Sequence, residues 1–468
     1  MTITEQSPLL GKQVVKKPSP WYIIAPMFAV TFAFGALYAP LIQFYTVVFC
    51  YKYYESQANN NLEGDVPSIE DCAIPEVQAI VSKSQAIIMF LTSASCLLSA
   101  SYYGSLSDRK GRRIVLLISS LGSMMTMIAY IMTIQYTHIF GISLLFIAPI
   151  IRGLFGGDNI LIVTAQAYIS DCTTPKSRTI AFGHLMAVVF LGPTIGPTVS
   201  SYILKTTGNI THVFIMVLLV NIIFELYVYF ILPESHDFTK FNAKKKTTFL
   251  QRINVFSALN ILFTTASKHA NRYALVLAGG IQFFLNMLIM PPTLLYAMLK
   301  FGWTAYEGGL YISLAAFTRL LVMVLILPVV SKLFHKNKAF VDKERKSSFA
   351  STSTSSSSLA QERKNEKPKD DQPHTEQDYQ HIIKFDTWMI RIGMLVEMLG
   401  FIAFGFVKTS TELVVVGSLQ SFALLAGPSI RSLQVTLVSP AQVGELMGAI
   451  AVVESISSKF FLKKVKDG

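Results

Sequence analysis

Arg152 and Asp158 have types and positions that could support ion, proton or solute chemistry, because both lie inside a long apolar stretch at residues 140–170. A charge at membrane depth is costly and normally faces a cavity or a partner, so it marks a functional site by default. Along a continuous helix six residues separate the two charges by about 9 Å and place them on different faces. We therefore expect separate roles for them, with an Arg152 to Asp158 ion pair as the alternative.

Further polar residues interrupt apolar stretches in the second half of the chain. Gln282 and Asn286 are four residues apart, so they share one face of a helix. They could donate hydrogen bonds into a cavity, and hydrogen bonds that hold helices together are an equal alternative. Other charges at membrane depth are Arg319, Arg391, Glu397 and Arg431.

A basic turn joins two apolar stretches at residues 104–113, with the sequence Gly-Ser-Leu-Ser-Asp-Arg-Lys-Gly-Arg-Arg. Residues 86–103 and 114–134 on either side are each long enough for a membrane helix, which takes about 20 apolar residues. Four cations at positions 108–113 retain such a short loop on the cytoplasmic side. Asp108 can accept charge-assisted hydrogen bonds from the arginines or lie at a helix N-terminus. A loop that only sets topology is the alternative interpretation.

The composition is that of a polytopic membrane protein. Hydrophobic residues make up 52% of the 468 residues and the mean hydropathy is +0.47, which is too apolar for a soluble protein. The net charge of +12 comes from loops and tails, where membrane topology explains it, so we expect no nucleic-acid partner. We find no metal-ligand spacing, no nucleophile constellation and no cofactor motif, so we expect neither an enzyme nor a cofactor.

The apolar stretches predict an all-α protein with about 10 to 11 membrane helices. Cation-rich loops follow the second, fourth, sixth and eighth spans and cation-poor loops follow the odd spans, which places the N-terminus inside. The eleventh span starts near Gly444 and holds about fifteen residues before Lys459. We therefore expect the second half to be truncated at its C-terminal end.

The basic turn resembles the signature loop of the major facilitator superfamily, which lies between the second and third helices of that fold. In that family the Asp and the basic residues latch the N-terminal bundle against a neighbouring helix and release it during alternating access. The segments ending in Asp171 and containing Pro233-Glu234-Ser235 also resemble that family. The resemblance assigns the gating role to Gly104, Asp108, Arg109, Gly111, Arg112 and Arg113.

Two more motifs resemble the same superfamily. Arg152 followed by Gly156-Gly157 is similar to the fourth-helix motif, in which the arginine is linked to proton transfer. The stretch with Gly192, Pro193 and Gly196 resembles the fifth-helix motif of exporters. The alternative interpretation is that these small residues only allow close helix packing.

The resemblance implies two six-helix bundles that rock around a site at the membrane midplane, the second of them truncated. The tetracycline-exporter and proton-coupled folate carrier branches, and their fungal vacuolar relatives, look most similar. In folate-type carriers an acid follows the helix-four glycines, so Asp158 is the expected proton-linked position, where protonation neutralises the carboxylate and shifts the conformational balance. The candidates that line the cavity, by the same resemblance, are Arg152, Asp158, Gln282, Asn286 and Arg431.

The chain divides into six parts. These are a cytoplasmic tail at 1–20, a six-helix bundle at 21–232, a cytoplasmic connector at 233–272, helices seven and eight at 273–334, an insert at 335–383, and helices nine, ten and a partial eleven at 384–468. The insert is charged and Ser-rich and cannot bury a core, so we expect it to be a disordered cytoplasmic segment.

Short motifs predict where the protein resides. Glu5, Leu9 and Leu10 match an acidic dileucine signal, which adaptor proteins read and which favours a vacuolar or lysosomal membrane over the plasma membrane. Asn209 begins a glycosylation sequon in a loop expected outside the cytosol. Cys50 and Cys72 flank another outside loop, where a disulfide can persist, and two free thiols are the alternative.

These observations together predict a secondary active transporter that moves a small organic solute or drug by alternating access, coupled to protons. The alternative is a non-transporting membrane sensor or assembly factor built on a truncated transporter. The predicted partners are the solute, protons, the lipid bilayer and adaptor proteins.

Overall fold

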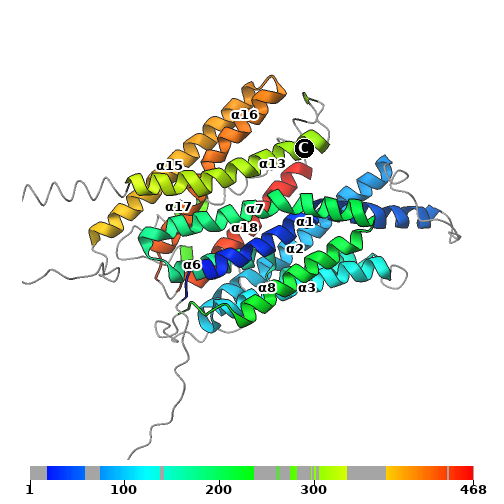
Figure 1. Cartoon of the computed structure of the whole chain (residues 1–468), viewed down its shortest axis with the longest axis horizontal. Helices are drawn as coiled ribbons and strands as arrows, with labels where there is room; N and C mark the ends of the chain where they lie inside the picture. The colour runs from blue at the N-terminus through cyan, green and yellow to red at the C-terminus, as the bar shows by residue number, and fades with distance from the viewer. Residues whose placement is uncertain are drawn as a thin grey trace, which may run out of the picture.

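The computed structural model describes residues 18–57, 74–136, 142–236, 261–262, 275–281, 297, 300–301, 305–334, 376–439 and 442–466. All regular structure within these ranges is helical. Most of the helices lie side by side with their axes in one general direction (Figure 1).

The first half of the chain forms six spans, of which the fourth is broken. Its helices are α1 (Trp21–Gln57), α2 (Pro75–Lys110), α3 (Arg112–Gln135), α5 (Ser143–Leu154), α6 (Gly157–Cys172), α7 (Pro175–Thr207) and α8 (Ile210–Phe230). Pro75 and Pro175 stand at the start of their helices, where the missing N–H has no intrahelical partner to lose. The fourth span consists of α5 followed by α6.

The second half is described from its eighth span onward. Its helices are α13 (Ala305–Leu321), the π turn η2 (Val322–Ile326) with helix continuing to residue 334, α15 (Glu376–Phe406), α16 (Ser410–Gln420), the 3-10 turn η3 (Ser421–Leu425), α17 (Ala426–Thr436) and α18 (Val443–Lys466). Helix α18 starts where the eleventh span is expected and continues through charged residues beyond Lys459. The predicted cavity residues Gln282 and Asn286 lie outside the described residues.

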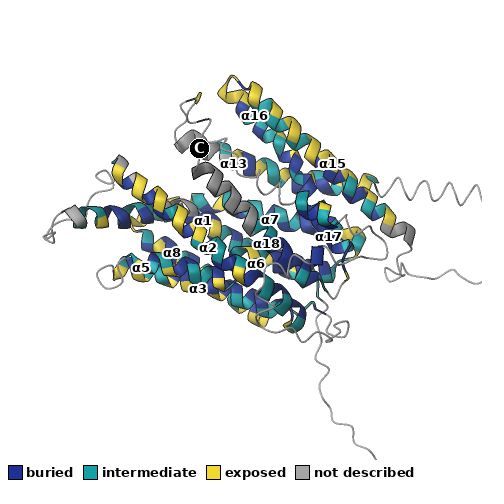
Figure 2. Ribbon diagram, turned by 180° about the vertical axis from the view of Figure 1, so that it is seen from behind, coloured by how far each residue is buried: buried dark blue, intermediate teal, exposed yellow. Residues whose placement is uncertain are grey.

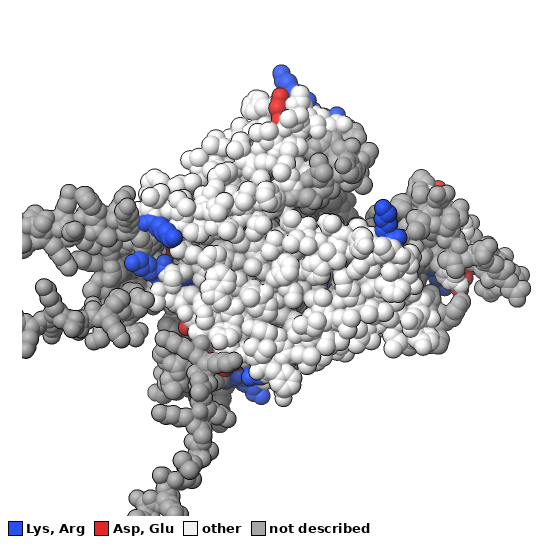
Figure 3. All heavy atoms as spheres, viewed as in Figure 1, with Lys and Arg blue, Asp and Glu red and all other residues white. Residues whose placement is uncertain are grey.

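Eight helical segments of the described chain are long and apolar enough to cross a membrane. Large apolar side chains on these helices are exposed, such as Phe230 at 74% exposure. Exposed positions run along the outer helices (Figure 2). The face in Figure 3 has a broad band without charged residues, and the charges gather toward its margins. Apolar surface of this extent is stable against lipid tails but not against water. The predicted all-α polytopic fold is confirmed.

Two seams join the first half to the second. At the first seam α18 packs against α2 and α6, and at the second α7 packs against α13, α15 and α17. The first seam is tight because a Cβ on Gly104 would lie 2.7 Å from the Gly444 carbonyl oxygen and 2.9 Å from the Gly448 Cα. Glycine at position 104 is therefore required for the close approach of the two backbones.

Candidate functional site

The turn between α2 and α3 is the single residue Gly111, whose φ of +98° is accessible to glycine at little cost. The carboxylate of Glu234 occupies the space that a side chain at Gly111 would need. Its two oxygens accept hydrogen bonds from the backbone N–H groups of Arg112 (2.9 Å) and Arg113 (3.1 Å). Because the first N–H groups of a helix have no intrahelical partner, Glu234 caps α3.

The Arg112 side chain is fully buried at the same end of the bundle, which we call the signature-loop end. Its Nη1 donates to Asp108 Oδ1 at 2.7 Å and its Nε donates to Asp171 Oδ2 at 2.9 Å. Ser107 Oγ accepts a further bond from Nη1 at 2.9 Å. One guanidinium thus joins the ends of α2 and α6 through charge-assisted bonds.

The carboxylate of Asp108 crosses the first seam. Its Oδ1 accepts from the backbone N–H of Gly444 at 2.8 Å, and its Oδ2 accepts from that of Glu445 at 2.7 Å. Both N–H groups belong to the first turn of α18, where the helix dipole favours an anion. Asp108, Arg112, Asp171, Glu234 and this first turn of α18 form one connected set, which we call the latch.

Two basic residues of the predicted gating motif lie elsewhere. Arg113 donates from Nε to the Val228 carbonyl at 2.9 Å and lies over the Tyr229 ring, 5.6 Å from its centroid, so it anchors α3 to α8. Arg109 lies in the last turn of α2. The structure therefore brings Asp108 and Arg112 into the latch, places Gly111 against the Glu234 carboxylate and places Gly104 at the first seam.

A buried carboxylate on α15 crosses the second seam, and it lies outside every motif of the sequence. Thr179 Oγ1, near the start of α7, donates to Asp386 Oδ1 at 2.8 Å, and the Asp386 side chain is fully buried. The neighbouring Arg178 donates from Nη1 to Thr436 Oγ1 of α17 at 3.2 Å. Both seams are therefore tied by hydrogen bonds at the signature-loop end.

The Thr179 to Asp386 bond can be tested by stability. Thr179→Val removes the donor and leaves a buried carboxylate with one partner fewer, so we expect a loss of about 1–3 kcal/mol. Thr387→Val is the matched control, since the Thr387 hydroxyl donates only to the Ile383 carbonyl within α15. Thermal unfolding in detergent should show the larger decrease in Tm for Thr179→Val. Equal decreases would mean that the seam bond adds nothing.

The fourth span breaks at a pair of glycines between α5 and α6. Gly156 and Gly157 have φ values of +98° and +58°. The break weakens the regular backbone ladder: the Gly153 carbonyl accepts from the Gly156 N–H at 3.0 Å, and the Gly156 carbonyl accepts from the Ile160 N–H at 3.4 Å. A membrane helix tolerates such a break when other groups add bonds to these carbonyls. Donors from α2 do so: Ser99 Oγ to Gly153 (2.8 Å), Tyr103 OH to Leu154 (3.0 Å) and Cys96 Sγ to Gly156 (3.2 Å).

The break changes the relation between Arg152 and Asp158, and our expectation of separate roles is wrong on this point. Arg152 Nη2 donates to both carboxylate oxygens of Asp158, at 2.6 and 2.7 Å. The expectation assumed a continuous helix, whereas the two left-handed glycines turn the chain between the two residues. Nearby, the hydroxyls of Tyr45 on α1 and Tyr130 on α3 lie 3.0 Å apart and interact electrostatically with Arg152.

The fold and the latch can be compared with those of known protein families. The family model described as Major Facilitator Superfamily matches residues 67–342, which is more than half of the chain. The chain belongs to the Major Facilitator Superfamily. Membership makes it a multi-pass membrane transporter and points away from an enzyme.

Relatives and solved structures agree with this membership. An uncharacterized membrane protein of Schizosaccharomyces pombe is 24% identical over 493 aligned positions, which cover 94% of this chain and 72% of that protein. The class C tetracycline resistance protein of Escherichia coli is 25% identical over 56% of this chain and 61% of its own length. The crystal structure of the human organic anion transporter MFSD10 has the same fold, with a TM-score of 0.65, 14% identity and coverage of 94% of this chain and 90% of that one.

The fifth-helix motif of this superfamily member packs against the first helix. A Cβ on Gly196 would lie 2.5 Å from the Ala36 backbone nitrogen, and one on Gly192 would overlap the Thr31 carbonyl group. Thr31 Oγ1 also donates to the Val188 carbonyl of α7 at 3.1 Å. Pro193 lies inside the same helix. These contacts fit the small-residue packing interpretation, and the exporter interpretation stays a prediction.

The remaining predicted residues are spread over the transporter. Arg431 of α17 is buried and forms an ion pair with Glu454 of α18. Asn209 is exposed at the N-cap of α8, where its Oδ1 accepts from the Thr211 N–H at 2.9 Å. Cys50 is disulfide-bonded. Cys72 and the sorting-signal residues Glu5, Leu9 and Leu10 lie outside the described residues.

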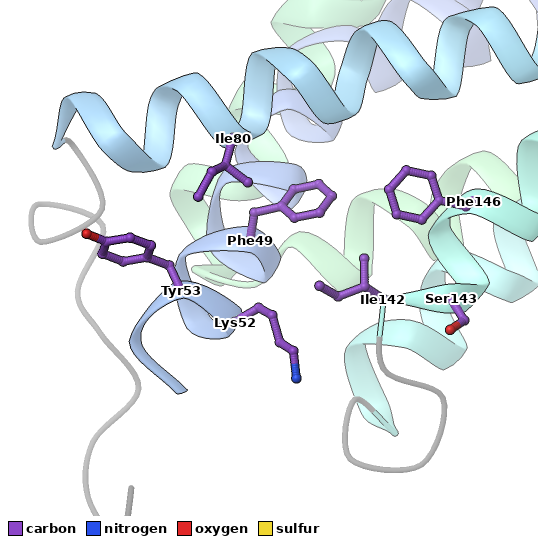
Figure 4. Close-up of a pocket in the computed structure, with 7 residues that line it drawn as sticks. All are labelled: Phe49, Lys52, Tyr53, Ile80, Ile142, Ser143 and Phe146. Atoms are coloured by element: carbon purple, nitrogen blue, oxygen red, sulfur yellow. The ribbon is translucent and has the colours of Figure 1, made fainter. Parts of the chain in front are cut away.

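A cavity of about 400 Å³ lies at the opposite end of the first half, between α1, α2 and α5 (Figure 4). Apolar side chains dominate its lining, with the rings of Phe49 and Phe146 facing each other at a centroid distance of 6.3 Å. Its one cation, Lys52, is already paired with Glu55 at 2.7 Å. Because this cavity lies within one half and not at a seam, it is not positioned to serve a rocking transporter as a solute site.

Proposed function

We propose that the chain is a secondary active transporter that moves a small organic solute by alternating access and couples this movement to protons. The observation that carries the proposal is the latch, in which one carboxylate of the first half, Asp108, caps the first turn of α18 in the second half. A contact that joins the two halves at one end only is what an alternating-access cycle has to make and break.

The latch supplies a discrete closed state. Arg112 holds Asp108 from within the first half, and the N–H groups of Gly444 and Glu445 bind it from the second. Because these bonds are short and directional, a small rocking of α18 breaks both together. The positive-inside rule predicts that this end is cytoplasmic, so the described conformation is closed toward the cytosol.

The ion pair of the fourth span supports the proton coupling. When Asp158 takes up a proton, its charge is lost and Arg152 is released from the two bonds that hold it. The side-chain donors at the break beside this pair all lie on α2, the helix whose last turn contains Asp108. A movement at the ion pair can therefore be transmitted to the latch through α2, which contacts both.

Solute-linked proton movement tests the proposal. The protein is reconstituted in liposomes that contain a pH-sensitive dye, and small organic anions, cations and drugs are added with and without an imposed pH gradient. We expect at least one solute to move protons in the protein-containing liposomes and not in empty ones. Folded protein that moves no protons with any solute class would contradict the coupling.

The proposed site of action is a vacuolar or lysosomal membrane, read from the dileucine signal at Glu5, Leu9 and Leu10. Adaptor proteins are the corresponding proposed partners. The exposed position of Asn209 is compatible with a glycan on the lumenal side.

A further inference from the structure

Arg319 is a cation at membrane depth that the latch and the fourth-span ion pair do not use. It lies on α13, within the candidate span at residues 314–334. Such a charge normally requires a partner or a water-filled cavity. Within the described part of the chain Arg319 makes no hydrogen bond and no ion pair, and its close contact is the Phe190 ring, whose centroid lies 5.8 Å from the guanidinium carbon.

The position of Phe190 places this guanidinium between the two halves. Phe190 belongs to α7 of the first half and stands near the middle of that 33-residue helix, so it lies close to the membrane midplane. Arg319 belongs to α13 of the second half. The pair therefore spans the second seam at mid-depth, about 11 residues, or roughly 16 Å of helix, away from Thr179 at the signature-loop end.

Four other buried or half-buried arginines differ from Arg319 in having acidic or hydrogen-bonding partners. They are Arg112 with Asp108 and Asp171, Arg152 with Asp158, Arg178 with Thr436, and Arg431 with Glu454. Arg319 alone among this group keeps its five N–H donors available. Arg319 is half-buried and its nitrogens are not among the fully buried unpaired atoms of the described chain, so its donors are accessible to a ligand.

Polar groups of the second half surround the Arg319 region. The carboxylate of Glu397 on α15 interacts electrostatically with Arg319 but accepts its hydrogen bond from Gln420 Nε2, at 3.0 Å. Next to Arg319 in sequence, the Thr318 hydroxyl lies 2.9 Å from that of Ser421. Glu397 therefore balances the charge of Arg319 at a distance without occupying its donors.

We propose that Arg319 binds the anionic group of the transported solute and that the solute class is organic anions with a flat apolar part. The guanidinium fork matches a carboxylate, sulfonate or phosphonate through two parallel hydrogen bonds. The Phe190 ring offers a face on which an aromatic or planar group can pack. This inference rests on the proposed transport function, because it assigns the solute to the seam that alternating access opens.

Because Arg319 and Phe190 come from different halves, the site can release its ligand when the halves separate. Arg319 and Phe190 move apart when the second seam opens, so the two parts of the solute lose their contacts together. An ion bound wholly within one half would not be affected by rocking in this way.

The test is anion binding to the detergent-purified full chain. Benzoate and 2-naphthoate are compared with the uncharged benzamide and 2-naphthamide by calorimetry and thermal shift. We expect the wild-type chain to bind 2-naphthoate at least tenfold more tightly than its amide. Arg319→Gln should remove this preference, Arg319→Lys should keep part of it, and Phe190→Leu should weaken naphthoate more than benzoate.

Arg391→Gln is the matched control, because Arg391 is also an arginine within a predicted span but is exposed on α15. It should leave anion binding unchanged. An Arg319→Gln protein that keeps the anion preference, or a wild-type chain that prefers no anion over its amide, would overturn the inference. The use of Arg319→Lys beside Arg319→Gln separates loss of the site from loss of the fold.

The same variants separate this inference from the proposed function. Proton-linked flux of a neutral or cationic solute that is insensitive to Arg319→Gln would overturn the anion site while the transporter proposal stands. Anion binding that depends on Arg319 without any flux would support the site and contradict the transport function.

Discussion

Arg112→Gln is expected to lower the free energy of unfolding by about 3–5 kcal/mol, which is the cost of removing one partner from a buried ion pair. The substitution leaves Asp108 and Asp171 without the guanidinium that lies between them at 2.7 and 2.9 Å. A typical domain has only about 5–15 kcal/mol in total, so a loss of this size removes a large share of the stability and should lower Tm markedly. Size-exclusion profiles and Tm in detergent measure the effect.

Lys110→Gln is the control for this prediction, because Lys110 is an exposed cation two residues away. It should change the free energy of unfolding by less than about 0.5 kcal/mol. Adding Asp171→Asn to Arg112→Gln should restore part of the loss, since one uncompensated carboxylate is neutralised. If Arg112→Gln is no less stable than Lys110→Gln, the latch does not depend on its central charge.

Asp158→Asn is expected to abolish proton-driven solute accumulation while solute exchange at equal pH continues. Asparagine resembles the protonated carboxyl group, so Arg152 is released permanently and the proton can no longer set the state of the ion pair. Accumulation against a gradient should fall by about 5- to 150-fold, the typical size of a coupling between two sites, when the site that links the two fluxes is lost. Radiolabelled solute uptake in liposomes, with and without a pH gradient, measures both activities.

Glu76→Gln is the control for Asp158→Asn, since Glu76 is an exposed carboxylate in the first turn of α2. Both activities should match those of the wild type in this variant. Asp158→Asn protein that accumulates solute normally at every pH gradient would show that the proton acts elsewhere.

Local sequence properties predicted the membrane fold well. Hydropathy and loop charge depend on neighbouring residues, so the spans of the first half and the turn at Gly111 follow from the sequence. Gly111 lies within the basic turn predicted at residues 104–113, and its φ of +98° is accessible to glycine at little cost.

The Arg152 to Asp158 relation could not be read from spacing alone. The prediction assumed that a regular helix joins the two residues. The Gly156-Gly157 pair between them indicates a possible helix break, but we interpreted it only as part of a family motif. The side chains of Cys96, Ser99 and Tyr103 add hydrogen bonds at the break, and they come from another helix.

The partners of the latch are distant in sequence. Asp171 and Glu234 lie 59 and 122 residues after Arg112, so no local pattern connects them. The resemblance drew attention to both segments without giving either carboxylate a role. Asp386 follows the polar insert and belongs to no recognised motif. Its contact with Thr179 arises only when the two halves pack at the second seam.

Alternating access is tested most directly by the distance between the two halves at the signature-loop end. Spin labels at Lys110→Cys on α2 and Lys384→Cys on α15, both exposed positions, are measured by pulsed electron spin resonance in liposomes. The free thiols are removed as Cys96→Ser and Cys172→Ser. Asp108→Asn removes charge-assisted bonds worth about 1.5–3 kcal/mol, which shifts a two-state balance roughly tenfold or more.

We predict one dominant short distance in the wild type at neutral pH, and a second, longer distance that grows with acid and solute and dominates in Asp108→Asn. A single distance that stays the same in the wild type, in Asp108→Asn and at every pH would contradict alternating access. It would instead indicate a membrane protein whose halves are fixed to each other.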